Sequence, residues 1–211
     1  MVDTASEPWV PSPRVGVDRK PLDRIGGEMA ARSTTVVRYG PGASFHAHDH
    51  PLGEEILVLE GTFSDEHGDY PAGTFFLNPP GFRHAPFSRE GCVIFVKLCQ
   101  YAGAGRHHLV VDTTTAAWRP GTVAGVACLP LYDHANYPET IALLRLDAGA
   151  TLPTAAAPGG AEIFVLDGML EDAHGVYPAG SWLRDPPGTS RALRSETGCT
   201  LYRKRNHLTA G

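Results

Sequence analysis

The feature that most restricts the fold of this chain is an internal repeat of domain size. Residues 42–97 align without a gap with residues 149–204, at a constant offset of 107 positions. Of the 56 aligned pairs, 24 are identical. The preceding segments also align, at an offset of 109, so that Trp9 matches Trp118. A repeat of this length predicts two copies of one structural unit that follow each other along the chain.

The repeated residues are mostly turn formers and apolar residues, which indicates short strands. The best-matched blocks are 55–61 with 162–168, 70–73 with 177–180, and 79–81 with 186–188. The 24 Gly and 18 Pro among 211 residues disfavour long helices, because Pro removes a backbone donor and Gly costs backbone entropy. Strand-length apolar or β-branched runs occupy residues 34–39, 55–59, 93–98, 141–146 and 163–166, and residues 65–68 have the composition of a hairpin turn. The prediction is an all-β protein of two barrels or sandwiches.

Charge and composition exclude several classes of partner. The formal net charge is −5, so no basic surplus is present to neutralise nucleic-acid phosphates. No apolar run approaches the roughly 18 residues of a membrane span, and residues 1–8 lack the basic and apolar regions of a signal peptide. A cytoplasmic location is expected, with buried free thiols rather than disulfides at Cys92, Cys99, Cys128 and Cys199.

Four residues of the first repeat have the types and spacing of a metal site. His48 and His50 are two apart, so both side chains face the same side of an extended strand. Glu54 begins the following apolar run, and His84 follows the turn at 79–81. Three imidazoles and a carboxylate suit one borderline divalent ion, and the absence of thiolates argues against a cysteine-type structural zinc site. His46 extends the pattern, but only the pair His48/His50 keeps the spacing to both Gly42 and Glu54. His46 is therefore expected either at the rim or in contact with the ligands from outside, and not as a ligand.

The second repeat provides an internal comparison. Its positions equivalent to the four candidate ligands hold Ala155, Ala157, Ala161 and Arg191. All four are replaced together, whereas the Gly, Pro and apolar framework persists. We therefore expect a metal in the first repeat only. Arg191 leaves two alternatives open for the second repeat, which either binds an anion or fills its interior.

Two motifs of the first repeat resemble those of the cupin superfamily. The first is Gly42-(x5)-His48-x-His50-(x3)-Glu54-(x6)-Gly61, and the second is Gly73-(x5)-Pro79-x-Gly81-(x2)-His84. The sequence of residues 50–73 is similar to that of ChrR-like cupins. This group includes zinc-binding anti-sigma factors and stand-alone cupins of the acetylacetone-cleaving type. The resemblance implies two tandem cupin (double-stranded β-helix, jelly-roll) barrels: residues 1–100 binding metal, a linker at 101–117, and residues 118–211 without ligands. It carries the ligand role to His48, His50, Glu54 and His84. Ser88 stands where the second motif often has Asn, a position that is not a ligand.

Three hypotheses of function follow, and the first is favoured. It is a mononuclear non-heme Fe(II) dioxygenase that cleaves a carbon–carbon bond of a small enolisable dicarbonyl or phenolic ketone, with Glu54 as ligand or local base. The second is a zinc-binding sensor or regulatory module, because four protein ligands saturate a tetrahedral zinc. Residues 1–40 lack a CxxC motif or an amphipathic helix, so the helical domain of the anti-sigma factors is not expected. The third is a metal-dependent isomerase, cyclase or lyase.

The expected cofactor is one divalent metal per chain, Fe(II) for an oxygenase, with Zn(II), Mn(II) and Ni(II) as alternatives. The expected partners are a small-molecule substrate and dioxygen, without nucleic acid or membrane, and a homodimer is compatible with the sequence. Residues that differ between the repeats supply candidates for the substrate pocket: Arg38, Phe75, Leu77 and Phe82. Ordinary packing is the alternative for each of them. His67 recurs as His174 and is expected to be structural, and the adjacent pair at 107–108 is expected to be solvated.

Overall fold

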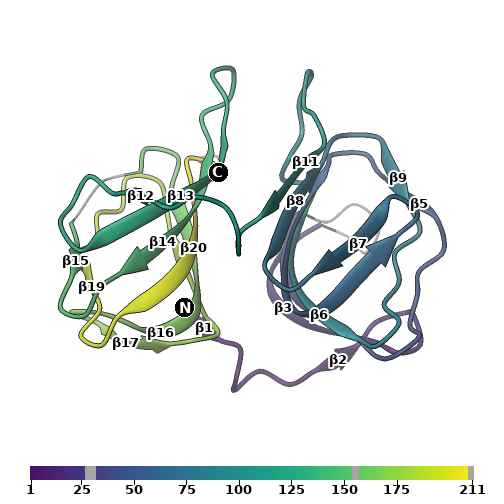
Figure 1. Ribbon diagram of the computed structural model, residues 1–211, viewed down its shortest axis with the longest axis horizontal. Coiled ribbons are helices and arrows are strands. Elements are labelled where there is room, and N and C mark those ends of the chain that lie inside the picture. Colours follow the sequence, from purple (N-terminus) through teal and green to yellow (C-terminus); the bar gives the residue numbers. More distant parts are fainter. Residues whose placement is uncertain (27–31, 154–156, 209–211) are drawn as a thin grey trace. The chain divides into compact units, whose positions relative to one another are not determined.

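The computed structural model describes residues 1–26, 32–153 and 157–208. These ranges contain strands and turns but no helix, and therefore no helix that could cross a membrane. The chain divides into two compact units. We call Pro8–Ala116 the N-terminal barrel, and Met1–Glu7 together with Ala117–Gly211 the C-terminal barrel. Figure 1 shows the strands of each unit wrapped around its own interior.

The N-terminal barrel is built on one antiparallel sheet with the order β11-β8-β6-β10-β4-β3-β2. A two-stranded ribbon, β5-β9, and the strand β7, which pairs with β6, complete it. Its strands are β2 (Val10–Pro11), β3 (Val17–Ile25), β4 (Arg32–Tyr39), β5 (His48–His50), β6 (Glu54–Asp65), β7 (Gly68–Pro71), β8 (Thr74–Asn78), β9 (Phe82–His84), β10 (Cys92–Leu98) and β11 (Leu109–Asp112).

The C-terminal barrel repeats this topology. Its main sheet has the order β1-β18-β16-β20-β14-β13-β12, and β17, β15 and β19 complete it. Its strands are β1 (Val2–Asp3), β12 (Arg119–Pro120), β13 (Val126–Asp133), β14 (Thr140–Leu146), β15 (Thr151–Leu152), β16 (Ala161–Asp172), β17 (Gly175–Pro178), β18 (Ser181–Asp185), β19 (Leu193–Arg194) and β20 (Cys199–Arg205). The two-barrel, all-β architecture predicted from the repeat is confirmed.

Alternating apolar side chains fill each barrel. In the N-terminal barrel the core includes Val37, Ile56, Val58, Phe76 and Ile94. The matching core of the C-terminal barrel includes Leu144, Ile163, Val165, Leu183 and Leu201. The thiols of Cys92 and Cys199 lie in these cores, as expected, and burial raises the pKa of Cys92 to about 11.

The longest strand of each barrel carries a β-bulge at the same place. The pairing of β10 with β6 shifts register so that Val93 faces Glu60 and Ile94 faces Val58, which leaves Leu59 unpaired. The equivalent shift in β16 lies at Leu166. A side chain changes face at every residue of a strand, so one extra residue reverses which positions point inward. Before the bulge the even-numbered residues of β6 point into the barrel, and after it the odd-numbered residues do. Phe63 therefore lies in the core, and Asp65, the last residue of β6, also points inward. Both ends of β6 thus face the barrel interior.

The leading strand of each repeat belongs to the barrel of the other repeat. Val2 pairs with Trp182 of β18, and Thr4 donates its hydroxyl to the Gly180 carbonyl at 2.8 Å. The equivalent segment of the second repeat pairs with β8 of the N-terminal barrel, where the Thr113 hydroxyl donates to the Gly73 carbonyl at 2.6 Å. In Figure 1 the purple segment leads from β1 to β2, and so from the C-terminal barrel to the N-terminal one.

These units differ from the boundaries expected from sequence. Residues 1–7 belong to the C-terminal barrel, and residues 109–112 of the expected linker form β11 of the N-terminal barrel.

The predicted strand runs are all observed, and two of them are longer than expected. The run at 55–59 is the first half of β6, and the run at 163–166 lies within β16. Apolar periodicity ends at the bulge, which explains the short prediction. The hairpin turn expected at 65–68 joins β6 to β7.

The close approach at the bulge makes Gly61 a sensitive position. Gly61 has a φ of +67°, and a Cβ there would overlap the carbonyl oxygen of Gly91. Gly42 has a similar φ of +74° but open space around it. We expect Gly61→Ala to lower the free energy of unfolding by about 3 kcal/mol or more, and Gly42→Ala by about 1 kcal/mol. Denaturant unfolding of the two variants tests this, and equal losses would contradict the close approach.

Candidate metal centre

Two short strands and the start of a third bring the four predicted ligands together. In the β5-β9 ribbon His48 lies opposite His84, and His50 lies opposite Phe82. Glu54 is the first residue of β6, on its inward-facing side. The turn at 79–81, in which the amide of Gly81 donates to the His50 carbonyl at 2.9 Å, ties β9 to β5. The spacing of the two motifs therefore becomes a set of donors in one place.

The three histidines form a compact group of donor atoms. One ring nitrogen from each of His48, His50 and His84 lies within 4.8 Å of the others. The Nε2 atoms of His50 and His84 are 3.0 Å apart. Glu54 Oε2 lies 3.5 Å from Nε2 of His50 and 3.6 Å from Nε2 of His84. His50, Glu54 and His84 are buried, and His48 is half-buried at the edge of the group.

Hydrogen bonds from outside the group fix how its members point. The Nδ1 atom of His84 is 3.0 Å from Asp65 Oδ2, and the Nδ1 atom of His48 is 2.9 Å from the His46 carbonyl. Both bonds leave Nε2 of the ring free to act as a donor. Asn78 donates its side-chain amide to Glu54 Oε2 at 2.9 Å. Such outer contacts orient ligands at metal sites and raise their basicity.

The ionisable groups influence one another's pKa values. Burial lowers the pKa of His50 and outweighs the opposing effect of the Glu54 carboxylate. Burial also disfavours the charged form of His84, but the hydrogen bond to Asp65 and the charge of Glu54 outweigh it, so the pKa of His84 is raised. Burial acts to raise the pKa of Asp65, whereas the bond from His84 and that from the His67 amide lower it overall. Protons and a metal ion would therefore compete for the imidazole of His84.

These residues fit a divalent cation. Three imidazole nitrogens face one another without an intervening carboxylate, and one carboxylate oxygen lies beside two of them. The Nε2 atoms of His50 and His84 point toward each other at 3.0 Å, a distance at which they share one proton. A bound cation would take the place of that proton. Neutral imidazole and carboxylate are the donors that iron, nickel, manganese and zinc accept.

A pocket of about 440 Å³ opens beside the histidines. Among its lining residues are His48 and His50 on the metal side, Phe45 and Leu98 on the apolar side, and the two cationic residues Arg14 and Arg19. Its volume falls within the range of sites for small organic ligands. The His46 side chain also lines it, which matches the rim position expected for that residue.

The pocket candidates chosen from sequence differences lie elsewhere. Arg38 is exposed, pairs with Asp18 at 2.7 Å and packs over the Trp9 ring, so it belongs to the outer face of β4. Phe75 and Leu77 are buried on the face of β8 opposite to the core residue Phe76. Adjacent residues of a strand point to opposite faces, so Phe75 and Leu77 point away from the interior that Phe76 fills, and neither lines the pocket beside the histidines. Phe82 is closer to the site, with its ring centroid 5.7 Å from that of His84, but it does not line the pocket.

Three residues near the histidines were missed by the sequence analysis. Asp65 was assigned to a turn, and it does accept the amides of His67 and Gly68, but its second oxygen bonds His84. Asn78 bridges Glu54 and Nδ1 of His108, which is 3.0 Å from the Asn78 amide oxygen. His108 is exposed, as expected, but its ring also stacks on Phe82 at 5.0 Å, a contact that the sequence did not indicate. The signal for Asp65 was its identity with Asp172 in the second repeat.

In the C-terminal barrel an arginine occupies the equivalent place. Arg191 pairs with Asp172 at 3.3 Å and with Asp185 at 2.8 Å. These are the counterparts of Asp65 and Asn78. Ala157 and Ala161, the counterparts of His50 and Glu54, line a cavity of only about 40 Å³ beside Arg191, and Ala155 lies outside the described residues. Because two carboxylates already neutralise Arg191, it fills the interior and is not an anion site.

Comparison with known proteins agrees with this architecture. A family model described as the ChrR Cupin-like domain matches residues 1–102 and again residues 106–209. The chain belongs to the ChrR cupin-like family. It carries the family's domain twice, so the predicted resemblance and the tandem cupin fold are confirmed. Comparison with curated protein sequences finds no match.

Several solved structures share the fold of this ChrR cupin-like chain at low sequence identity. A candidate dioxygenase from Nostoc punctiforme superposes with a TM-score of 0.80 at 13% identity, covering 100% of this chain and 83% of the other. The bacterial pirin YhhW from Escherichia coli, in complex with nickel(II), gives 0.73 at 13% identity and covers 98% of each chain. Oxalate decarboxylase OxdC from Bacillus subtilis gives 0.65 at 11% identity, covering 99% and 77%. These similarities establish the cupin fold.

Removal of one central imidazole tests the ligand set. We expect the wild-type protein to bind one divalent ion per chain, and His84→Ala to abolish stoichiometric binding, measured by calorimetric titration with Ni(II) and by metal analysis. His174→Ala, in the equivalent turn to His67 of the other barrel, is the control and keeps one ion. One tightly bound ion in His84→Ala would contradict the assignment.

The Asp65 carboxylate offers a finer test, because it touches the ligand and not the ion. We expect Asp65→Asn to weaken Ni(II) affinity by about 10- to 100-fold, since a neutral amide no longer holds or polarises His84. Asp69→Asn removes an exposed carboxylate from the neighbouring strand and leaves the affinity unchanged. Equal affinities of the wild type and Asp65→Asn would show that His84 needs no such support.

Proposed function

We propose that the N-terminal barrel is a mononuclear non-heme metal dioxygenase, with Fe(II) as the native metal. It would cleave a carbon–carbon bond of a small enolisable dicarbonyl or phenolic ketone. The observation that carries the proposal is the convergence of His48, His50, His84 and Glu54 beside an open pocket of about 440 Å³. A purely structural ion would not require a substrate-sized space next to its ligands.

The chemistry of the donors supports an octahedral ion. Four protein ligands saturate a tetrahedral zinc, whereas an octahedral ion with the same ligands keeps two positions for other molecules. When bound, Fe(II) would supply those positions and the redox chemistry of the reaction. For a β-diketone, addition of one dioxygen molecule and cleavage of one carbon–carbon bond gives a carboxylic acid and an α-oxo aldehyde. Both oxygen atoms enter the products, so no external reductant is consumed.

The residues of the chain bind and orient the substrate. Arg14 and Arg19 place positive charge in the pocket, and the acidic residue of its lining, Asp49, pairs with Arg83, so the pocket favours an enolate over the neutral ketone. Phe45 and Leu98 provide an apolar surface for the carbon skeleton and exclude water from one side. The Glu54 carboxylate, held by the Asn78 amide, acts as a ligand or as the base that accepts the proton lost on enolisation.

Oxygen uptake by the iron-loaded protein tests the proposal. We expect anaerobically purified, Fe(II)-loaded protein to consume dioxygen with a β-diketone or a hydroxyacetophenone, one molecule per molecule of substrate. His84→Ala should consume none, and His174→Ala should match the wild type. Measurement uses an oxygen electrode together with product analysis.

Two results would redirect the proposal. Purification with tetrahedral zinc alone, and no oxygen uptake after iron loading, would favour a zinc-binding sensor or regulatory module. Substrate turnover without oxygen uptake would favour a metal-dependent isomerase, cyclase or lyase. The proposal includes a cytoplasmic location. It also includes a small-molecule partner rather than nucleic acid.

A further inference from the structure

The C-terminal barrel, which lacks the histidines, still has a pocket at the equivalent place. The pocket has a volume of about 330 Å³. Several residues of the two linings occupy equivalent positions of the repeat. Phe45 is equivalent to Leu152, His46 to Pro153, and Leu98 to Arg205. The second repeat therefore has a pocket of similar size to that of the first, although it lacks the metal ligands.

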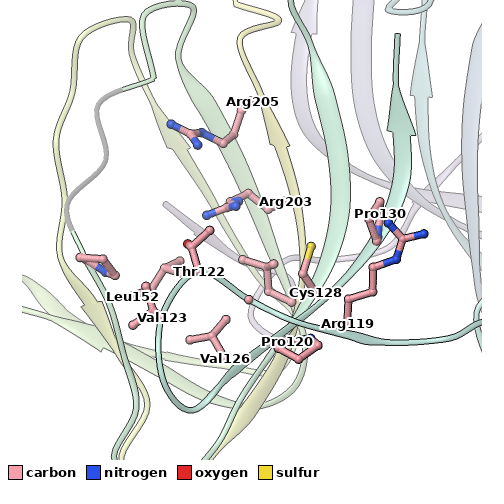
Figure 2. Close-up of a pocket in the computed structure, with 13 residues that line it drawn as sticks. Arg119, Pro120, Thr122, Val123, Val126, Cys128, Pro130, Leu152, Arg203 and Arg205 are labelled. Atoms are coloured by element: carbon pink, nitrogen blue, oxygen red, sulfur yellow. The ribbon is translucent and has the colours of Figure 1, made fainter.

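Two arginines on β20 line this pocket, and a third, Arg119, lies in β12. Arg203 and Arg205 stand where the N-terminal barrel has Val96 and Leu98. Figure 2 shows the side chains of Arg203 and Arg205 projecting to the same side, with the Arg203 guanidinium close to Thr122 of the pocket lining. The intervening residue is lysine in both repeats. Because Val96 and Leu98 serve the same fold in the N-terminal barrel, the barrel itself does not require charge at these positions.

The Arg203 guanidinium has no carboxylate partner among the residues that the structure describes. The described residues that line the pocket include no acidic residue, and the one that lines the small adjoining cavity, Asp185, pairs with Arg191. Burial, followed by repulsion from Arg205, lowers the pKa of Arg203 to about 10. The group is still charged at neutral pH, and a partly desolvated cation without a counter-ion favours an anionic ligand.

We propose that the C-terminal barrel binds a small organic carboxylate, with its carboxylate group on Arg203 and Arg205 and its apolar body against the pocket wall. Arginine presents paired donors that match the two oxygens of a carboxylate. The remaining wall is largely apolar, formed by Val123, Val126, Leu144, Leu152 and Pro153. A compact body such as an aromatic ring fits this lining better than a fully polar anion.

The proposed carboxylate site is separate from the metal centre. None of its lining residues belongs to the N-terminal barrel, so it does not depend on the proposed oxygenase activity. It also differs from the alternative raised by Arg191, whose charge is already neutralised by two aspartates.

Calorimetric titration of the full chain with benzoate tests the proposal. Wild type and His84→Ala are compared, because a ligand held by the metal centre would be lost in the second protein. We expect one benzoate per chain in both. Arg203→Met keeps an apolar stem and should weaken binding at least tenfold, whereas Arg194→Met, an exposed arginine of the same barrel, should leave it unchanged. Arg203→Lys keeps the charge without the paired donors and should bind with intermediate affinity, a result that does not depend on the Met variant folding.

Inorganic phosphate and benzyl alcohol separate charge from apolar contact. Both should bind at least tenfold more weakly than benzoate. The proposal is overturned by the absence of saturable benzoate binding below about 10 mM, the weak end of small-molecule affinity. It is also overturned by loss of binding in His84→Ala, by equal losses in Arg203→Met and Arg194→Met, or by phosphate or benzyl alcohol binding as tightly as benzoate.

Discussion

A buried carboxylate at the end of the longest strand is the constraint around which both barrel interiors are arranged. Asp65 and Asp172 occupy equivalent positions at the ends of β6 and β16, and each caps the turn that follows. One oxygen satisfies the turn amides, and the other faces inward. A buried carboxylate requires a hydrogen-bond donor or a cation nearby. In the N-terminal barrel His84 supplies the donor, and in the C-terminal barrel Arg191 supplies the cation.

The two partners of this aspartate, His84 in one barrel and Arg191 in the other, have opposite consequences for ligand binding. An imidazole bonded through Nδ1 leaves Nε2 exposed to the interior, where two further histidines can join it around one ion. A guanidinium spans the space between Asp172 and Asp185 and neutralises it, so the ligand positions can shrink to alanine without leaving an unpaired charge. The alanines at the former ligand positions are therefore compatible with the arginine that now pairs with the same carboxylate. Both pockets carry arginines, but from different strands: Arg19 of β3 lines the N-terminal pocket, and Arg203 and Arg205 of β20 line the C-terminal one.

Much of the fold and of the candidate site was visible in the sequence. The ungapped repeat predicted two copies of one barrel, and the spacing of His48, His50, Glu54 and His84 predicted the group that the structure brings together. The roles of Asp65 and Phe75 were not visible, and both depend on which face of a strand a residue occupies. Asp65 points inward because the bulge at Leu59 reverses the alternation along β6. Phe75 points away from the core because it neighbours Phe76. No composition or spacing rule locates a bulge, so inward and outward positions beyond it cannot be assigned from sequence alone.

The crossing of the leading strands sets a limit on where the chain can be divided. Each repeat begins with a Val-Asp-Thr segment that pairs with the barrel of the other repeat, through Thr4 on Gly180 and through Thr113 on Gly73. A gene fragment cut at the repeat boundary would leave one barrel with a strand it does not use and without the strand it needs. Two identical single repeats could satisfy each other by exchanging these strands. The tandem chain is thus equivalent to an exchanged dimer joined by a covalent link, which frees one half to change its chemistry while the other keeps its histidines.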